Sequence, residues 1–503
     1  MKITLISPYP DITAFGIRTI SAHLKQHHFL TQLIFLPDPF VDRVVTSRER
    51  YDEKALDEVA QLCSHSDLVG VTLMTNFFDG AVQITKNIKS KLNIPVIWGG
   101  IHPTVRPDEC LNYADMVCIG DGEDAMLELI QKMEIKTNYS DVQNIWFRKD
   151  GDIIKNGMRP LEQDIDKIAS PDYDLEDNYI LDNYRIIPIN AIEMEKQIKH
   201  SLFSLTVKHP SYMTLSGRGC PHNCTYCCND NLRKLYHGQK YLRWRSTEHV
   251  IGELAAIKEK FPYINYFCLS DDSFFARNTE KIKEFCAAYK KEIHMPFYCL
   301  GSPMTITEEK LEYLIDAGLE AIQMGIETGS KHIQEIFNRK YMTNERVMKA
   351  IHAINMYKDK LSLITYDFIL DVPYETDEDK VETLAFISKI PKPYKIGMFA
   401  IIFYPGTSLY DRVKKDNLII DEETEIYHKK WSKKEAHYLN LLLALCKGGK
   451  FPHSLLRILI SKPVLQVLNS DLLKPTYKLL FYLLKKVNYG IKSLRNFLKP
   501  PGA

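Results

Sequence analysis

Four cysteines gather in the stretch "SGRGCPHNCTYCCND", which spans residues 216–230. Cys220, Cys224 and Cys227 follow a C-x3-C-x2-C spacing, and Cys228 comes directly after them. The chain has eleven cysteines, an odd number, and they lack the regular spacing of a secreted disulfide framework. Thiols at this density therefore predict a metal site in a reducing compartment.

Two kinds of metal site fit this spacing. A cubane of four irons normally takes four thiolates, so three close cysteines would leave one iron open to a substrate or cofactor. Zinc is the alternative, because four thiolates can close a tetrahedral structural site. Zinc ligands are usually separated by about two to four residues, whereas Cys227 and Cys228 are adjacent. The spacing favours an iron–sulfur cluster with one open iron.

The elements that must position this loop alternate along residues 211–405. Amphipathic segments separate six runs with the composition of strands: "YMTLSG", "YFCLSD", "PFYCLGS", "AIQMGIE", "LITYDFIL" and "GMFAIIF". Six repeats fall short of the eight that close a full barrel. We expect a partial (β/α)6 TIM-type barrel with its active site at the carboxyl ends of the strands.

Residues 1–135 show the same alternation of short apolar runs and amphipathic segments. This pattern predicts an α/β domain with a doubly wound, Rossmann-like parallel sheet, whose ligands bind beyond the carboxyl ends of the strands. Either a ligand or ordinary tight turns would explain the small residues at these ends. The candidates there are Thr72, Leu73, Gly99, Gly100, Gly120 and Gly122.

Four regions follow from these patterns. Residues 1–135 form the first domain, 136–205 a connector, 206–425 the partial barrel and 426–503 a basic helical region. Within the connector, "NIWFRKDGDIIKNG" predicts a hairpin that turns at Asp150-Gly151.

The cysteine stretch and four later segments carry a family resemblance. "CPHNCTYC", with Tyr226 before the third cysteine, resembles the signature of the radical S-adenosylmethionine (radical SAM) superfamily. "LSDDSF", "MGIETGS", "DVPYETDED" and "YPGTSLYD" resemble that family's later strand-end segments, with Asp371 where glycine is usual. The matches span roughly residues 212–412.

The resemblance implies a set of cofactor ligands. Cys220, Cys224 and Cys227 would bind a [4Fe-4S] cluster whose open iron chelates the amino and carboxylate groups of SAM. Reductive cleavage of SAM would release a 5′-deoxyadenosyl radical that abstracts hydrogen from the substrate. Cys228 lies outside the motif and is interpreted as a loop thiol. The residues implied to contact SAM are Tyr226, Ser270, Asp271, Asp272, Gly325 and Glu327.

Residues 1–135 are similar to the cobalamin-binding domain that precedes many radical SAM domains. The similarity implies that the six strand-end residues named above approach the corrin or its nucleotide tail. Relatives with a histidine lower ligand read D-x-H-x-x-G after the first strand, whereas residues 11–16 here read "DITAFG", with Thr13 at the histidine position. A histidine lower ligand from this loop is therefore not expected. We interpret His102 as a hydrogen-bonding loop residue rather than a metal ligand.

Together these features predict a cobalamin-dependent radical SAM enzyme that methylates an unactivated carbon of a small-molecule or lipid-like substrate. It would need a reductant such as a flavodoxin or ferredoxin. One alternative is a radical SAM cyclase, ring-modifying or C–C coupling enzyme that does not use cobalamin as methyl donor. Another is a zinc- or cluster-stabilised interaction protein without enzymatic activity.

Net charge is uneven along the chain. Residues 429–503 contain fifteen Lys/Arg against two acids, a net charge of +13, so the remaining residues carry about −12. An apolar stripe at helical spacing runs through this basic region: Tyr477, Leu480, Leu484, Val487, Ile491, Leu494 and Leu498. The stripe could contact a membrane surface or dock on the barrel, and a nucleic-acid partner is disfavoured. The N-terminus predicts a strand rather than a signal peptide, so we expect a cytoplasmic protein, peripheral at the inner face of the membrane if the stripe binds lipid.

Overall fold

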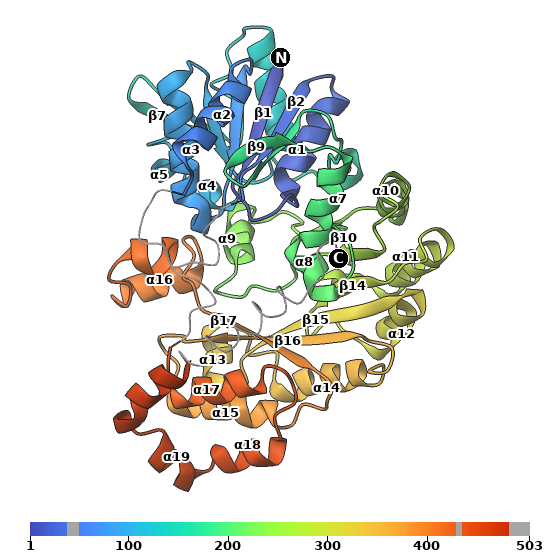
Figure 1. The fold of residues 1–503 in the computed structure, drawn as a ribbon, viewed down its shortest axis with the longest axis vertical. Helices are drawn as coiled ribbons and strands as arrows, with labels where there is room; N and C mark the ends of the chain where they lie inside the picture. Colours follow the sequence, from blue (N-terminus) through green and yellow to red (C-terminus); the bar gives the residue numbers. More distant parts are fainter. Residues whose placement is uncertain (38–49, 429–434, 482–503) are drawn as a thin grey trace. The chain divides into compact units, whose positions relative to one another are not determined.

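The computed structural model describes residues 1–37, 50–428 and 435–481. The chain divides into two compact units (Figure 1). Among the described residues, the first unit contains 1–301, 309–322 and 402–428, and the second contains 302–308, 323–401 and 435–481.

A nine-stranded sheet lies in the first unit, with the strand order β7-β6-β5-β4-β3-β1-β2-β8-β9. Its five central strands are parallel and are β1 (Lys2–Ser7), β2 (Leu30–Phe35), β3 (Leu68–Thr72), β4 (Val96–Gly99) and β5 (Met116–Cys118). The helices between them are α1 (Phe15–Gln26), α2 (Glu53–Cys63), α3 (Phe78–Lys91), α4 (Ile101–Val105), α5 (Pro107–Cys110) and α6 (Glu123–Glu134). Helix α1 packs beside α6 and α2 beside α3, and the predicted doubly wound sheet is confirmed.

Two hairpins extend this sheet at its edges. The hairpin β6–β7 (Ile145–Lys149, Asp152–Lys155) pairs with β5, and β8–β9 (Asn178–Asp182, Arg185–Pro188) pairs with β2. Asp150 and Gly151 have φ of 53° and 91°, which confirms the predicted turn. The sheet thus continues past residue 135, into the segment that the sequence marks as a connector. The boundaries of the four regions predicted from the sequence, after residues 135, 205 and 425, stay predictions.

The core of this sheet is closely packed. Trp98 of β4 is fully buried, its indole N–H donates to Thr85 Oγ1 over 2.8 Å, and its ring stacks on Tyr113. Phe78 of α3 meets the edge of the same indole. Burying one such side chain contributes roughly 1.5–3 kcal/mol, so these contacts hold α3 and β4 in a fixed position.

A six-stranded sheet has the order β10-β13-β14-β15-β16-β17 and confirms the predicted partial barrel. Its strands are β10 (Ser211–Thr214), β13 (Tyr266–Leu269), β14 (Phe297–Gly301), β15 (Leu319–Glu327), β16 (Leu363–Leu370) and β17 (Lys395–Ala400). The helices of this region are α7 (Ala191–His200), α8 (Leu202–Val207), α9 (Cys228–Leu235), α10 (Thr247–Lys260), α11 (Thr279–Glu292), α12 (Glu308–Ala317), α13 (Lys331–Ile336), α14 (Asn344–Asn355), α15 (Asp377–Ile387) and α16 (Ser408–Lys415). All six strands coincide with the predicted runs.

Side-chain caps fix where the barrel helices begin. Ser246 accepts from the His249 N–H at the start of α10, and Asn278 accepts from the Lys281 N–H at the start of α11. Helix α15 begins with a reciprocal capping box between Thr376 and Asp379. Each cap satisfies backbone donors that the helix leaves open and contributes about 1 kcal/mol.

Three short helices follow in the second unit: α17 (Tyr438–Cys446), α18 (His453–Leu459) and α19 (Lys462–Leu468). Leu439 and Leu443 of α17 are fully buried, so this helix is part of the unit's core. Of the predicted apolar stripe, Tyr477 is buried against Tyr438 and Leu480 is exposed. The stripe residues Leu484, Val487, Ile491, Leu494 and Leu498 lie outside the described residues. Within the described ranges, no helix has the length and hydropathy needed to span a bilayer.

Candidate cofactor sites

The three motif cysteines lie on one loop of the first unit. Strand β10 leads into the two-residue strand β11 (Gly217–Arg218), which pairs with β12 (Arg243–Trp244), and the loop then runs to helix α9. Gly219 has φ of 88°, and a Cβ at this position would lie 2.7 Å from the Tyr241 carbonyl oxygen. Only glycine fits there, so the entry to the loop is fixed.

Three hydrogen bonds hold the loop. Arg233 donates to the carbonyl oxygen of Cys220 over 2.6 Å, and the Leu409 N–H donates to that of Thr225 over 2.8 Å. The Cys227 N–H donates to the carbonyl oxygen of Cys224 over 3.1 Å. Cys224 is buried, whereas Cys220 and Cys227 are partly exposed. The loop is therefore anchored through backbone groups.

The Cys227 thiol is more acidic than the Cys220 thiol. A hydrogen bond from the Cys228 thiol, together with the backbone N–H and side chain of Asn229, lowers the pKa of Cys227 to about 7. Burial raises the pKa of Cys220 to about 12, so this thiol would ionise only on binding a metal. Within residues 1–37, 50–428 and 435–481, no three His, Cys, Asp or Glu side chains converge on a point where one metal ion would bind. A cubane has no such requirement, because each thiolate binds a different iron. The donor set therefore fits a cluster.

Three predicted SAM residues, Ser270, Asp271 and Asp272, follow β13, and their surroundings differ. Asp272 accepts from Asn229 Nδ2 over 3.1 Å, and Asn229 also contacts Cys227 Sγ at 3.6 Å, so this carboxylate lies beside the cysteine loop. Burial raises the pKa of Asp272. Ser270 Oγ lies 3.1 Å from Cys268 Sγ.

Asp271 is buried and fully hydrogen-bonded. Its Oδ1 accepts from the backbone N–H groups of Ser216 and Gly217, and its Oδ2 accepts from the Ser216 hydroxyl and from Arg277. The carboxylate thus holds the start of the cysteine-bearing segment. A direct contact of Asp271 with SAM stays a prediction.

Two further predicted SAM residues lie at the end of β15 in the second unit. The Gly325 carbonyl oxygen accepts from Arg339 over 2.7 Å, and Glu327 has φ of 72°. A side chain at position 325 would overlap the Glu327 carboxylate, so Gly325 leaves room for that carboxylate to fold back over the strand. Tyr226 lies on the cysteine loop and is half-buried.

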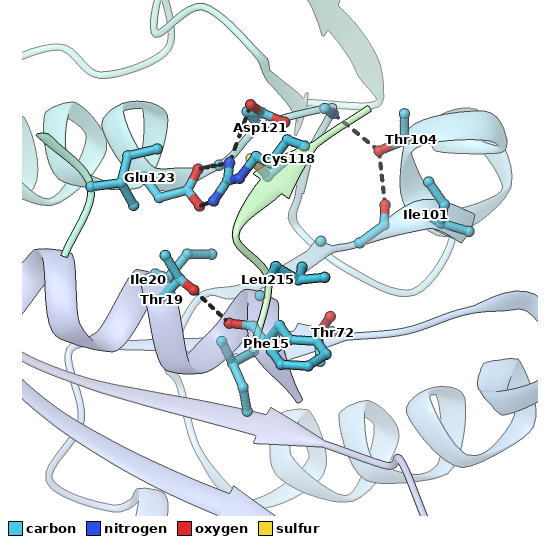
Figure 2. Close-up of a pocket in the computed structure, with 18 of the residues that line it drawn as sticks. Phe15, Thr19, Ile20, Thr72, Ile101, Thr104, Cys118, Asp121, Glu123 and Leu215 are labelled. Carbon is cyan, nitrogen blue, oxygen red and sulfur yellow. Dashed lines mark hydrogen bonds and ion pairs between the residues drawn. The ribbon is translucent and has the colours of Figure 1, made fainter. Parts of the chain in front are cut away.

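A cavity of about 490 Å³ opens in the first unit at the carboxyl ends of the parallel strands (Figure 2). Five of the six predicted cobalamin residues line it: Thr72, Gly99, Gly100, Gly120 and Gly122. The sixth, Leu73, is fully buried in the core beneath. From the barrel side, the lining includes Thr214, Leu215 and Arg218, which precede the first motif cysteine, and also Asp272.

The lining suits a large ligand with an apolar body and polar edges. Apolar side chains such as Phe15, Ile20 and Met126 form much of the wall. Two buried polar atoms on the wall, Thr214 Oγ1 and Arg243 Nε, have no hydrogen-bond partner. A corrin carries amide groups around an apolar ring, so it would supply partners for such atoms. The residues present therefore fit cobalamin.

Gly100 lines the cavity and packs closely against the backbone of Leu73. Its φ is 101°, and a Cβ there would lie 2.9 Å from the Leu73 carbonyl oxygen.

His102, two residues further along the chain, is fully buried, and its Nδ1 lies 3.1 Å from Thr75 Oγ1. Burial lowers the pKa of His102 to about 3, so this side chain is neutral, and its Nδ1 faces a hydroxyl. His102 is not among the residues that line the cavity.

The loop after β1 lacks a histidine, as the sequence indicates. Asp11 accepts hydrogen bonds from both the backbone N–H and the hydroxyl of Thr13, which closes a tight turn before α1. Thr13 therefore stabilises its own loop. Phe15 and Gly16, which follow this turn, line the cavity.

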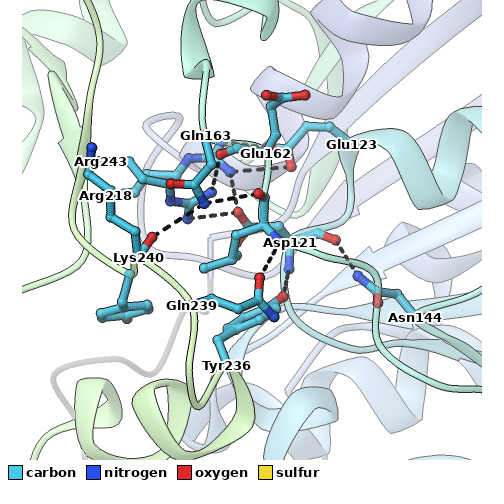
Figure 3. A network of polar contacts seen from close by, with 12 residues as sticks. Asp121, Glu123, Asn144, Glu162, Gln163, Arg218, Tyr236, Gln239, Lys240 and Arg243 are labelled. Carbon is cyan, nitrogen blue, oxygen red and sulfur yellow. Dashed lines mark hydrogen bonds and ion pairs between the residues drawn. The ribbon is translucent and has the colours of Figure 1, made fainter.

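A polar network joins the cavity loop to the barrel segment (Figure 3). Arg218 contacts Asp121 at 3.2 Å and Glu123 at 2.5 Å, and Arg243 contacts Asp121 at 3.0 Å. The Asp121 N–H donates to the Tyr236 phenol oxygen over 2.9 Å. Although burial raises the pKa of Asp121, the two guanidinium groups outweigh it and hold that pKa below its usual range. We call Asp121, Glu123, Arg218, Tyr236 and Arg243 the Asp121 network.

Two family models match this chain. The radical SAM superfamily model matches residues 214–387, and the B12 binding domain model matches residues 1–130. The chain therefore contains a radical SAM domain that follows a B12 binding domain. This radical SAM protein carries its B12 binding domain in front of the barrel, and its cofactors are a [4Fe-4S] cluster, SAM and cobalamin. The chain is therefore an enzyme, and the zinc-stabilised interaction protein considered from the sequence is not supported.

Several proteins are similar to this radical SAM protein. An uncharacterized methyltransferase of Pyrococcus horikoshii is 26% identical over 393 residues, which cover 74% of this chain and 77% of that protein. The bacteriochlorophyllide d C-8(2)-methyltransferase of Chlorobaculum tepidum is 24% identical over 375 residues, 72% of this chain and 71% of that protein. The methyltransferase TsrM of Kitasatospora setae, solved with cobalamin and a [4Fe-4S] cluster, shares the fold with a TM-score of 0.63. That similarity covers 82% of this chain and 78% of TsrM at 15% identity.

The sequence did not single out the side chains of the Asp121 network. Asp121 and Glu123 lie in the segment "IGDGEDAMLEL", and Arg218 lies in "SGRGC", but no local pattern pairs residues so far apart. Charge alternation within "GDGED" and a lone arginine before the cysteines were the only available signals. Asn229, which contacts Cys227 Sγ, was also missed.

Proposed function

We propose that this radical SAM enzyme transfers a methyl group from SAM, by way of cobalamin, to an unactivated carbon of a small-molecule substrate. One observation carries the proposal. The cavity at the strand ends of the B12 binding domain is lined from the other side by Thr214, Leu215, Arg218 and Gly219, the residues that lead into Cys220. Two cofactors bound at these places would be neighbours.

Each group of residues has a defined task in this proposal. Cys220, Cys224 and Cys227 hold a [4Fe-4S] cluster, which supplies the electron that cleaves SAM to a 5′-deoxyadenosyl radical. The glycine-lined strand ends hold cobalamin, which supplies the methyl group. Apolar side chains of the cavity would exclude water and other molecules from the bound cofactors.

The similar proteins described above support methyl transfer, although a further relative, the anaerobic magnesium-protoporphyrin IX monomethyl ester cyclase of Synechocystis, is 24% identical over 348 residues. Two of the similar proteins named above are methyltransferases, and the B12 binding domain is matched over its strand-end loops. In this chain the same loops have glycine at positions 99, 100, 120 and 122, where a large ligand needs close access to the backbone.

An experiment without the substrate tests this proposal. The anaerobically reconstituted enzyme is reduced, loaded with cobalamin and incubated with methyl-labelled SAM. Methyl transfer predicts that label appears on protein-bound cobalamin and that S-adenosylhomocysteine forms in equal amount. Cleavage of SAM to 5′-deoxyadenosine with no label on cobalamin would instead assign the enzyme to cyclisation or coupling.

A reductant and a membrane surface are the partners we propose. Electron supply to the cluster requires a reductant, for which a flavodoxin or ferredoxin is suitable. Ile458, Val467 and Leu472 have exposed fractions of 58%, 65% and 87%, and they lie among Lys450, Arg457, Lys462, Lys474 and Lys478. Apolar side chains flanked by cations suit the headgroup layer of an anionic bilayer.

Point substitutions test membrane contact better than deletion of the C-terminal region. Such a deletion would also disturb α17, which is part of the core of the second unit. The triple variant Ile458→Ser, Val467→Ser, Leu472→Ser is expected to reduce sedimentation with phosphatidylglycerol vesicles. Ile192→Ser with Leu202→Ser is the control, since these side chains are also exposed, by 80% and 71%. If the wild-type protein does not sediment with these vesicles, it does not bind the membrane surface.

A further inference from the structure

Arg218 lies two residues before Cys220 and contacts two acids of the B12 binding domain. Its guanidinium meets Glu123 Oε1 at 2.5 Å and Asp121 Oδ2 at 3.2 Å. Glu123 is buried, with 8% of its side chain exposed. An arginine can satisfy both acceptors at once because its donors form a rigid planar fork.

Arg243 and Tyr236 hold the same loop from the same segment of chain. Arg243 contacts Asp121 Oδ2 at 3.0 Å with only 2% of its side chain exposed. The phenol oxygen of Tyr236 accepts from the Asp121 N–H. Strands β11 and β12 pair Arg218 with Arg243 directly, so the two arginines move as one piece.

The charges of the Asp121 network balance. Two carboxylates face two guanidinium groups, and burial of the network strengthens each interaction. Loss of Arg218 alone would leave Glu123 buried without its cation, which costs far more than removing both partners together. The geometry of residues 120–123 therefore depends on Arg218.

The four residues 120–123 also line the cobalamin cavity. On the other side, Tyr236 of the network shares an apolar cluster with Tyr241, and contacts lead from Tyr241 to the cysteines. Arg233 lies over the Tyr241 ring and donates to the Cys220 carbonyl oxygen. The Tyr241 hydroxyl donates to Asn229, which contacts Cys227 Sγ. The cavity loop and the cysteine loop are thus parts of one contiguous set of contacts within the first unit.

We propose that Arg218 is a positioning residue that couples the two cofactor sites: binding of the cluster favours binding of cobalamin, and the reverse. Cobalamin orders residues 120–123, these residues fix Arg218 and Arg243, and the β11–β12 pair then fixes the entry to the cysteine loop. The inference rests on the two cofactors and not on the reaction that they perform.

Linkage gives this proposal a quantitative form. If cluster loading tightens cobalamin binding by some factor, cobalamin must tighten cluster binding by the same factor. Couplings of this kind are typically about 5- to 150-fold. We expect the wild-type factor to be at least about fivefold.

The test measures binding of hydroxocobalamin to the full-length protein by anaerobic equilibrium dialysis, with and without the cluster. In the wild type, cluster loading should lower the Kd for hydroxocobalamin at least about fivefold. In Arg218→Met the Kd should be the same with and without the cluster, within about twofold. Release of iron to a chelator should be slowed by hydroxocobalamin in the wild type and not in Arg218→Met.

Two further variants keep the proposal falsifiable. The charge-balanced double variant Arg218→Met, Glu123→Gln leaves no unpaired buried acid. It replaces the single variant if Arg218→Met fails to fold. The double variant should also lose the coupling. Arg159→Met is the control, because it removes an ion pair with Glu128 in the same domain. This variant should keep the coupling. The proposal is overturned if the wild-type Kd does not depend on the cluster, or if Arg218→Met keeps the wild-type ratio. Methyl transfer is not measured, so the proposed reaction could fail while this coupling holds.

Discussion

The phenol oxygen of Tyr236 accepts a hydrogen bond from the backbone N–H of Asp121 over 2.9 Å, across 115 residues of sequence. Tyr236 immediately follows α9, the helix that begins beside the last motif cysteine. Asp121 lies between the two glycines that line the cavity after β5. A single hydrogen bond therefore joins the end of the cysteine segment to the loop that would hold cobalamin.

Substitution of Gly120 tests this junction. Gly120 has φ of 73°, and a Cβ there would overlap the Tyr236 hydroxyl. Gly120→Ala is expected to displace Tyr236, to cost about 1–3 kcal/mol of stability and to weaken hydroxocobalamin binding at least tenfold. Thermal unfolding and equilibrium dialysis measure the two effects.

The double variant Gly120→Ala, Tyr236→Phe is the control for this prediction. Without the hydroxyl most of the overlap disappears, so part of the lost affinity should return. Wild-type affinity in Gly120→Ala alone would show that this turn does not contact the ligand.

The cysteines provide a matched pair of variants within one loop. Cys224→Ala is expected to abolish iron loading and formation of 5′-deoxyadenosine, because a cubane held by two thiolates is unstable. Cys228→Ala should keep the iron content and raise the pKa of Cys227, since the Cys228 thiol donates the hydrogen bond that lowers it. Iron analysis and a 5′-deoxyadenosine assay of both variants check the assignment. Activity in Cys224→Ala would contradict it.

Acid stability depends in part on His102. Its pKa is about 3 in the folded protein, where burial opposes the charge, and about 6.5 when the chain is unfolded. Below about pH 6.5 the unfolded state therefore binds more protons, and stability present at neutral pH is lost as the pH falls toward 3. Lowering the pH from 6.5 to 5 should cost about 2 kcal/mol through this group.

Urea unfolding at pH 7 and pH 5 measures that loss. In His102→Gln the free energies of unfolding at pH 7 and pH 5 should differ less than in the wild type, by about 2 kcal/mol, because glutamine does not titrate. Glu109 Oε2 lies 3.7 Å from His102 Nε2 and would favour the protonated ring. An unchanged pH dependence in the variant would show that Glu109 compensates for burial.

Asp371 links the fifth barrel strand to the C-terminal helices within the second unit. It stands where related sequences are expected to have glycine, and its φ of 61° is one that glycine favours. Its carboxylate accepts from Asn440 Nδ2 over 2.7 Å and from the Glu435 N–H over 3.0 Å. The strained backbone is thus offset by contacts that hold α17.

Asp371→Gly should relax the backbone and free this helix. We expect faster hydrogen exchange in Tyr438–Cys446, because the buried Asn440 side chain loses an acceptor, which costs about 1–3 kcal/mol. Asp359→Gly, a substitution at an exposed position, should leave that exchange unchanged. Equal exchange in all three proteins would mean that apolar packing alone holds α17.

Periodicity predicted the strands, but long-range pairing and side-chain direction could not be read from it. Leu73 follows Thr72 directly, yet Thr72 lines the cavity and Leu73 lies in the core, because successive side chains of a strand point to opposite faces. From the sequence, hairpins β6–β7 and β8–β9 were assigned to a connector. The strands of the main sheet that pair with these hairpins, β5 and β2, lie outside that segment. The sequence did not single out Arg218, since its partners come from a distant part of the chain.

Cobalamin content of the anaerobically reconstituted protein, after incubation with hydroxocobalamin and gel filtration, tests the central claim most directly. A cavity lined by Gly99, Gly100, Gly120 and Gly122 at the strand ends predicts retention of close to one cobalamin per chain. Absence of bound cobalamin from a protein that still cleaves SAM would contradict the account, because methyl transfer would then have no donor.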